Sequence, residues 1–507
     1  METTRTKNTK RNIISGLIKQ FSSLLLAFII RTVILYYLGA EYQGLNGLFT
    51  SILQMLNLTD LGFSTAVMYI LYKPIAQDDK ETIRGIVNYL KKIYLIVGLI
   101  ILVLGICLMP FLRYLISSDI PDGINIYILF AIYLLNSSLS YILFAYKSAY
   151  LSALQKESVV SNAFTLTSIF IKIVQLVLLI FFKNYYIYVL TLPIGTALYN
   201  IAVQIASKRI SPDIFPKGTI PNDLKLNFKK QVKAIFIGKI SDVARNSLDN
   251  IVLSAFLGLV AVAIYDNYYY IYSAIYGIMG IIIHGMMASV GNSIATESKE
   301  KNYTDLKKFN FIFMIIVGWC SICMLCLYQP FMLIWMKNDQ SMLFDDRDMF
   351  LFCFYFYAIN MTYVRSMYLD GYGLFHECRY WCVVEAVSNL VLNIALGYFF
   401  GITGIIIATI ITIIVFNFIC RSNVLFKYYF NISPKEFYFE HFLYLLVALF
   451  IALLVYFLCS LLPFTGIINI VLRLAVCLIV PFVLYFLIYF KTKHFKETKE
   501  IVKRLFH

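Results

Sequence analysis

Long apolar stretches separated by short polar segments recur along the whole chain of 507 residues. Each holds about 20 or more mostly apolar residues, the length that a helix needs to cross a hydrocarbon core roughly 30 Å thick. The pattern therefore predicts an all-α, polytopic membrane protein with about fourteen transmembrane helices. The predicted spans are 13–38, 43–73, 88–117, 123–149, 157–182, 185–207, 233–257, 262–293, 307–337, 348–372, 378–400, 403–428, 441–462 and 466–490.

Composition supports this interpretation, because 60% of the residues are hydrophobic and only 14% are charged. An average soluble domain is about a quarter charged. No segment is long and polar enough to form a conventional soluble enzyme, so we expect no catalytic residues. The chain also has no glycine-rich phosphate loop, which argues against direct ATP coupling within it.

The net charge of +15 does not indicate a nucleic-acid partner, since no basic soluble face is predicted. With the N-terminus placed inside and each predicted helix crossing once, 35 of the 43 Lys and Arg fall at inside positions. Basic residues are retained on the cytoplasmic side of membranes, so both termini are predicted to be cytoplasmic. The eight exceptions are Arg113, Lys183, Lys337 and Arg347 in outside loops and Arg31, Lys172, Arg245 and Arg473 within spans.

The ten cysteines lie mostly inside apolar runs, where they are typical of small buried side chains. Cys320, Cys323 and Cys326 are spaced like metal ligands, but no His or acid lies near them in sequence. We therefore predict no metal site.

The chain resembles itself at an offset near 219 residues. The informative matches are Leu38-Gly39 with Leu257-Gly258, the segment 147–151 with 365–369, and Asn200 with Asn417. Because each repeat contains an even number of helices, the two six-helix bundles are predicted to be parallel. The predicted domains are 1–207, a cytoplasmic linker at 208–232, 233–430, and a segment 431–507 with two extra helices and a basic tail.

Three segments resemble a known family. They are a Leu-Gly-x-x-x-x-Gly-Leu turn at 38–45, an Asp-Leu-Gly at 60–62, and Tyr-Lys-Pro-Ile-Ala at 72–76. Together with the repeat, they make the chain resemble the Wzx-type oligosaccharide flippases of the multidrug/oligosaccharidyl-lipid/polysaccharide (MOP) exporter superfamily. The resemblance covers essentially the whole chain and implies a MATE-like fold with two bundles around a central cavity.

What the resemblance implies is alternating-access movement of an undecaprenyl-diphosphate-linked oligosaccharide across a bacterial cytoplasmic (inner) membrane. Surrounding lipid and a polysaccharide polymerase or ligase are the implied partners. We predict no cofactor other than a coupling proton or sodium ion. The alternatives are flipping of a peptidoglycan precursor, a cation-coupled multidrug exporter of the same superfamily, and a membrane glycan polymerase or glycosyltransferase.

Ionisable residues within spans mark pathways or buried pairs. Arg31 and Lys172 are predicted to bind the diphosphate, because Arg binds phosphate oxygens bidentately and Lys acts as a point charge. The alternatives are snorkelling for Arg31 and a carboxylate partner for Lys172. Tyrosines along 262–293 are expected either to stack on sugars or to anchor the helix at an interface.

Asp242, Arg245 and Asp249 share one face of the predicted helix 233–257. Either they neutralise one another, or Arg245 joins Asn246 and Asn250 in a polar stripe that contacts substrate. The candidate groups for ion coupling or charge pairing are Asp60, Asp242, Asp249 and Glu385.

Overall fold

The computed structural model describes residues 2–57, 63–492 and 495, and over these residues it contains helices and no strand. A helix satisfies its own backbone hydrogen bonds, which is the requirement for crossing lipid. The chain divides into two compact units, Met1–Ala263 and Ile264–His507. Each unit is described by itself.

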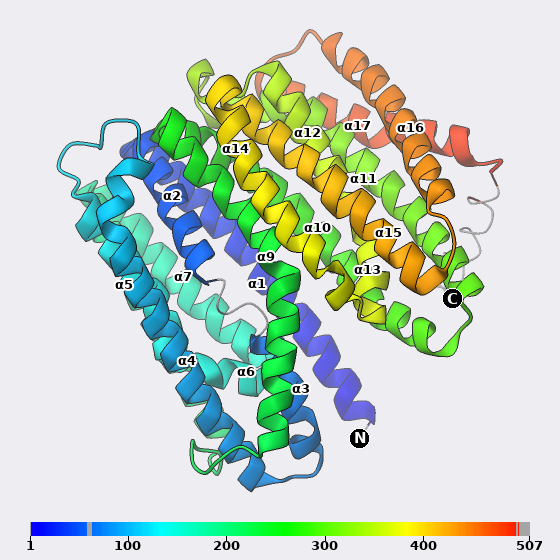
Figure 1. Cartoon of the computed structure of the whole chain (residues 1–507). Helices are drawn as coiled ribbons and strands as arrows, with labels where there is room; N and C mark the ends of the chain where they lie inside the picture. Colours follow the sequence, from blue (N-terminus) through cyan, green and yellow to red (C-terminus); the bar gives the residue numbers. More distant parts are fainter. Residues whose placement is uncertain (1, 58–62, 493–494, 496–507) are drawn as a thin grey trace. The chain divides into compact units, whose positions relative to one another are not determined.

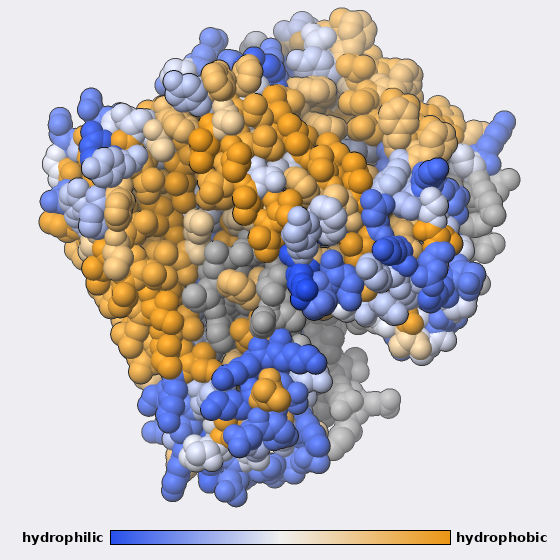
Figure 2. Space-filling model, in the orientation of Figure 1, coloured by the Kyte–Doolittle hydropathy of each residue, from blue (hydrophilic) through white to orange (hydrophobic). Residues whose placement is uncertain are grey.

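In unit 1, helices α4 (Lys80–Leu108) and α5 (Ile126–Ile142) pack side by side (Figure 1). Many of their large apolar side chains are exposed. Figure 2 shows the surface of these two helices as an apolar band with polar residues at both ends. Its elements are α1 (Glu2–Tyr37), α2 (Ala40–Leu56), α3 (Phe63–Ala76), α4 (Lys80–Leu108), η2 (Met109–Leu115), α5 (Ile126–Ile142), α6 (Ala145–Ala153), α7 (Glu157–Phe182), α8 (Tyr185–Ile210), α9 (Asn222–Leu257) and the first residues of α10 (Leu259–Thr296).

Unit 2 holds the rest of α10 and the remaining helices. They are α11 (Lys299–Trp335), η3 (Gln340–Met342), α12 (Asp346–Asn360), α13 (Tyr363–Tyr372), α14 (Phe375–Thr412), η4 (Ile413–Cys420), α15 (Arg421–Leu425), η5 (Phe426–Phe430), α16 (Lys435–Ser460) and α17 (Gly466–Tyr489). Its core is aromatic: Tyr268 stacks on Phe344, and Tyr272 stacks on Tyr355. These two tyrosines of α10 are buried and pack within unit 2, so they serve its core.

By length and composition, nine of the described helices are able to cross a membrane, or ten if the bent pair α5 and α6 is one span. The chain is therefore a multi-pass membrane protein. The predicted spans 233–257 and 348–372 are not among them, and 43–73 runs through residues 58–62, which lie outside the described residues. The predicted spans 378–400 and 403–428 fall in one candidate, Phe375–Phe430. Gly401, with φ 60° and ψ −135°, bends the chain between these two predicted spans. The count of fourteen stays a prediction.

The loop between the repeats is shorter than the predicted linker. Residues 211–221 connect α8 to α9, and α9 begins at Asn222 after Pro221. The first eleven residues of α9 are too polar to belong to an apolar run, yet they continue the helix. Because α9 packs against α2 and α3, it lies in unit 1. The domain boundaries deduced from the repeat stay a prediction.

Repeat-related glycines occupy equivalent backbone positions. Gly39 has φ 118° and separates α1 from α2, and Gly258 has φ 82° and separates α9 from α10. A positive φ is strained for residues other than glycine. Gly44, the second glycine of the Leu-Gly-x-x-x-x-Gly-Leu turn, has a different role, since a Cβ there would overlap the backbone carbonyl of Leu259. The motif thus combines a break between helices with a close backbone approach.

Two carbonyls, each left without its helical donor by a proline, accept hydrogen bonds that join α11 and α17. A proline inside a helix removes the N–H that would bond the carbonyl four residues earlier. Pro330 of α11 leaves the carbonyl of Cys326, which accepts a bond of 3.1 Å from Nη1 of Arg473 in α17. Pro481 of α17 leaves the carbonyl of Cys477, which accepts a bond of 2.7 Å from Nε1 of Trp319 in α11. Each helix therefore supplies the donor that the other helix lacks.

Replacing Gly44 by alanine is expected to destabilise the protein by about 1–3 kcal/mol, the usual cost of overpacking. The added methyl group would force the start of α10 away from α2. Thermal unfolding of the purified protein in detergent would show the loss. Gly16→Ala is the control, because a Cβ at Gly16 meets no atom within 4 Å. Equal melting temperatures for G44A and G16A would contradict the close approach.

Trp319→Phe is expected to cost about 1–3 kcal/mol, the usual cost when a buried acceptor loses its donor, because it leaves the buried Cys477 carbonyl without the indole N–H. The readout is the same melting experiment. Trp381→Phe serves as the matched control, since the Trp381 indole N–H makes no hydrogen bond with the described residues. A loss as large in W381F as in W319F would show that indole size matters rather than the bond.

Candidate functional site

The predicted polar stripe on α9 lies largely inside unit 1. Arg245 is 4% exposed and donates to Oδ1 of Asp242 at 2.8 Å, whereas the Asp242 side chain is 52% exposed. Asp249 is buried, and Asn250 donates from Nδ2 to the Ser51 hydroxyl of α2 at 3.0 Å. The i, i+3 pair therefore forms, and Asn250 joins α9 to α2.

Two of the predicted site residues lie wholly or partly outside the part of the chain that the structure describes. Asn246 belongs to α9, but its side chain is outside the described residues. Asp60 falls in the segment 58–62, which is also outside them. Their predicted roles stay predictions.

Arg31 and Lys172 lie on two packed helices of unit 1, α1 and α7. Asn12 of α1 bonds with Gln155 and Ser158 at the start of α7, and Lys19 lies over the Phe164 ring. The helices are therefore parallel, and this register places Arg31 about one turn beyond Lys172. The structure thus brings the two predicted phosphate ligands to neighbouring levels of one helix pair.

The two cations have different surroundings. Both side chains are half-buried, and Arg31 interacts electrostatically with Tyr188 of α8. Lys172 makes no hydrogen bond or ion pair with any described residue, although it lies within an apolar helix. The predicted alternative for Lys172 is a carboxylate of the second or the eleventh predicted helix, Asp60 or Glu385; Glu385 belongs to unit 2 and accepts from Arg421 there, so its pairing with Lys172 stays a prediction. A bond to Asp60 lies outside the described residues.

Unit 2 contains a buried ionic network. Glu385 of α14 is 1% exposed and accepts from Nη2 of Arg421 at 2.7 Å. Asn417 donates to Glu385 at 3.4 Å and accepts from Nη2 of Arg365 at 2.7 Å. Arg365 is fully buried, and its Nε and Nη1 have no partner among the described residues. The network thus holds two guanidinium groups and one buried carboxylate, an unusual arrangement in an apolar interior.

Irregular helix geometry assembles this network. The segments η4 and η5 are π-helices on either side of α15, and π-helical turns are frequent at functional sites. Asn417 lies within η4. Arg421 is the first residue of α15, which begins directly after η4. One helix therefore presents an amide and a guanidinium to the same carboxylate of α14.

Sequence reasoning found only part of this network. Glu385 is a predicted site residue, but the charge count placed both Arg421 and Arg365 among the cytoplasmic cations. The internal repeat pointed to the other members of the network, because it pairs Lys147 with Arg365 and Asn200 with Asn417. Lys147 is also buried, and its Nζ donates to the Ile214 carbonyl at 3.2 Å. Equivalent positions thus carry buried cations with different partners.

Three thiols meet in the interior of unit 2. The sulfur atoms of Cys326, Cys459 and Cys477, from α11, α16 and α17, lie within 4.8 Å of one another. This set shares only Cys326 with the three cysteines that are spaced like metal ligands in the sequence. Its three thiols are close enough to bind one metal ion. Binding requires deprotonated thiols, and burying several thiolates in an apolar interior is costly. The contacts are equally those of small buried side chains, so the absence of a metal stays a prediction.

The chain also matches known proteins. The family model described as "Polysaccharide biosynthesis protein" matches residues 9–287, more than half of the chain. No curated protein sequence matches the chain. In fold, the chain is similar to the structure described as "Lipid II flippase MurJ, inward closed conformation", with a TM-score of 0.68 and 16% identity over 94% of this chain and 99% of that chain.

Two further structures share the fold. One is an inward-facing multidrug resistance MATE family transporter of the MOP superfamily, with TM-score 0.59 and 15% identity over 82% of this chain and 99% of that chain. The other is a MOP superfamily transporter from Pyrococcus furiosus, with TM-score 0.56 and 14% identity over 83% of this chain and 96% of that chain.

These findings define the class as an all-helical membrane protein with the fold of MOP superfamily transporters. The chain belongs to the polysaccharide biosynthesis protein family. The predicted family and the predicted MATE-like fold are confirmed.

Removing the carboxylate of the ionic network is expected to destabilise unit 2. Glu385→Gln leaves Arg365 and Arg421 buried without their central anion, and breaking a buried ion pair costs about 3–5 kcal/mol. Unfolding by titration of detergent-purified protein with SDS measures the change. The double variant Glu385→Leu with Arg421→Met is expected to retain more stability than E385Q, because it leaves one buried cation, Arg365, without an anion instead of two.

The control for this experiment is Asp213→Asn at an exposed pair. Asp213 lies in the loop after α8, and the hydrogen bond from Lys80 lowers the pKa of its carboxyl. Exposed ion pairs contribute little, so D213N should unfold nearly as the wild type does. A cost in E385Q no larger than in D213N would contradict the importance of the buried network.

Proposed function

We propose that this protein is a flippase that moves undecaprenyl-diphosphate-linked oligosaccharide across the bacterial cytoplasmic membrane by alternating access. The proposal is supported by its family, whose description is polysaccharide biosynthesis, and by its fold, shared with a lipid II flippase. In this proposal both termini are cytoplasmic, the chain transports rather than catalyses, and a polymerase or ligase consumes the product.

The observation that carries the proposal is the pair of cations on α1 and α7. A lysine within an apolar helix is costly, and Lys172 has no acidic partner among the described residues. A ligand that brings negative charge would offset that cost. A diphosphate binds Arg bidentately and Lys as a point charge, so Arg31 and Lys172 suit its headgroup. A cationic drug would meet repulsion at the same helices.

The other predicted residues have secondary roles in the proposal. Asn250 and Arg245 would hold α9 in place, and Asn246 remains a candidate substrate contact. Asp60, Asp249 and Glu385 remain candidates for binding a proton or a sodium ion. Glu385 is engaged by Arg421 at 2.7 Å, so coupling through it would require that pair to open first. Asp242 is more exposed than Asp249 and Glu385.

Translocation of a fluorescent polyprenyl-diphosphate oligosaccharide in proteoliposomes tests the proposal. Arg31→Ala and Lys172→Ala are each expected to lower the transport rate at least about tenfold, since each removes a charge-assisted contact to phosphate. Lys183→Ala is the matched control, because it removes an exposed cation from the end of the same helix. Correct folding of each variant is verified by its melting curve.

Two outcomes would overturn the proposal. One is the absence of flipping by folded wild type under every imposed ion gradient, combined with export of a cationic dye, which would identify a multidrug exporter. The other is equal flipping by wild type, R31A and K172A, which would remove these cations from the substrate site.

A further inference from the structure

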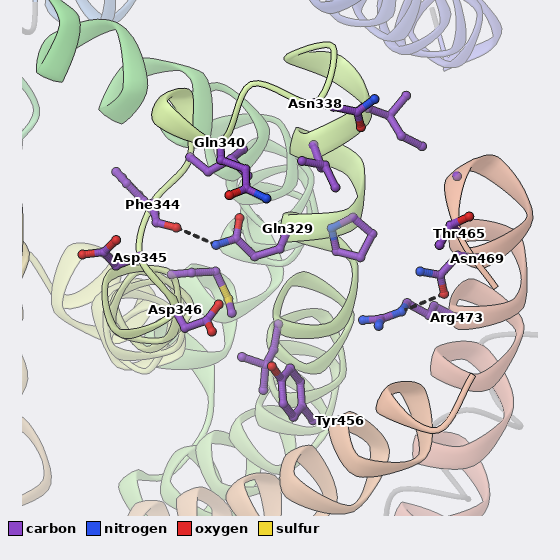
Figure 3. Close-up of a pocket in the computed structure, with 17 residues that line it drawn as sticks. Gln329, Asn338, Gln340, Phe344, Asp345, Asp346, Tyr456, Thr465, Asn469 and Arg473 are labelled. Atoms are coloured by element: carbon purple, nitrogen blue, oxygen red, sulfur yellow. Dashed lines mark hydrogen bonds between the residues drawn. The ribbon is translucent and has the colours of Figure 1, made fainter. Parts of the chain in front are cut away.

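An open pocket of about 800 Å³ lies within unit 2, and none of its lining residues belongs to the ionic network. Figure 3 shows its walls, formed by the end of α11, the segment through η3, the start of α12, and the facing ends of α16 and α17. This volume is in the usual range for small-molecule sites. The pocket lies at the end of the unit that carries Lys337 and Arg347, the end predicted to face outward.

One wall carries a guanidinium with unused donors. Arg473 lies seven residues after the start of α17, about 10 Å along the helix, where a charge is costly. Its Nε donates to Asn469 at 3.0 Å and its Nη1 to the Cys326 carbonyl at 3.1 Å. These bonds fix the side chain but use two of five N–H groups. Nη2 donates to no described residue.

The opposite wall carries two carboxylates. Asp345 and Asp346 begin α12 and line the same pocket. Neither makes a hydrogen bond or an ion pair within the described part of the chain, and neither lies within ion-pair distance of Arg473. Figure 3 shows Asp346 and Arg473 on opposite sides of the space, with Tyr456 below it. The pocket therefore presents separated positive and negative groups that do not neutralise each other.

The surroundings of the pocket favour an amphiphilic ligand. Tyr456 and Ile334 line the pocket and are 40% and 36% exposed. Leu453 and Ile467, on the two helices of the C-terminal hairpin, are 65% and 71% exposed. In a membrane protein such surfaces face acyl chains. A headgroup in the pocket would thus leave its chains against an apolar helix surface.

We propose that this pocket binds a zwitterionic aminophospholipid of the phosphoethanolamine class. Its phosphate would accept from Arg473, and its primary ammonium would donate to Asp345 and Asp346. A purely anionic lipid would leave the two carboxylates unpaired, and a quaternary amine has no N–H to donate to them. The inference concerns a lipid that stays bound at the C-terminal helices, so it is independent of the transported substrate.

Native mass spectrometry of the full chain in detergent tests the proposal, with dioleoyl phosphatidylethanolamine, phosphatidylcholine and phosphatidylglycerol as probes. The wild type is expected to bind phosphatidylethanolamine about tenfold more tightly than the other two, because only this lipid pairs both charged walls. Equal binding of all three lipids would overturn the proposal. This comparison needs no variant, so it stands even if a substitution impairs folding.

Variants then assign the contacts. The double variant Asp345→Asn with Asp346→Asn is expected to abolish the preference for phosphatidylethanolamine over phosphatidylglycerol. Arg473→Gln is expected to weaken all three lipids, because all share the phosphate. Asp119→Asn is the control for the carboxylate variants, and Arg113→Gln is the control for Arg473→Gln. Like Arg473, Arg113 donates to backbone carbonyls, those of Ile116 and Ser118, but it lies in unit 1. A lipid preference unchanged in D345N/D346N would contradict the assignment.

Because the readout is lipid binding, it separates this inference from the proposed function. A variant that loses phosphatidylethanolamine but still flips oligosaccharide supports the pocket as an independent site. Loss of flipping in R31A with an unchanged lipid preference leaves the pocket intact.

Discussion

Every polar group inside this apolar chain needs a partner, and the hydrogen bonds between α11 and α17 show how that constraint is met. Pro330 and Pro481 each leave a carbonyl without its helical donor, at Cys326 and Cys477. Arg473 and Trp319 supply donors from the opposite helix. An unsatisfied carbonyl in hydrocarbon costs several kcal/mol, so these bonds hold α17 against α11 within unit 2.

The same constraint produces the chemistry of the molecule. The Arg473 bond that satisfies Cys326 also places the remaining guanidinium donors in a pocket opposite Asp345 and Asp346. In the ionic network, π-helical turns bring Asn417 and Arg421 to Glu385, while Arg365 keeps two nitrogen atoms without described partners. In unit 1, Lys172 has no described partner at all. Two of these incompletely bonded cations, Lys172 and Arg473, lie where ligands are proposed to bind.

The internal repeat conserves backbone shape more closely than side-chain chemistry. Gly39 and Gly258 both adopt positive φ and separate consecutive helices. Lys147 and Arg365 are both buried, but Lys147 donates to a backbone carbonyl and Arg365 to Asn417. Matched positions of the predicted repeat therefore carry buried cations with different hydrogen-bond acceptors.

The sequence by itself determined that the chain is helical and crosses the membrane many times, because runs of about 20 apolar residues have one stable form in lipid. It also singled out Arg31, Lys172, Arg245 and Glu385, since a charge inside an apolar run is visible without a structure. Tertiary structure alone decided their partners. The charge count placed Arg421 and Arg365 among the cytoplasmic cations, but helix packing buries both side chains. Only the tertiary structure brings Cys326, Cys459 and Cys477 together, because they are far apart in sequence. Pairing depends on which helix faces meet, and local apolar patterns carry no information about that.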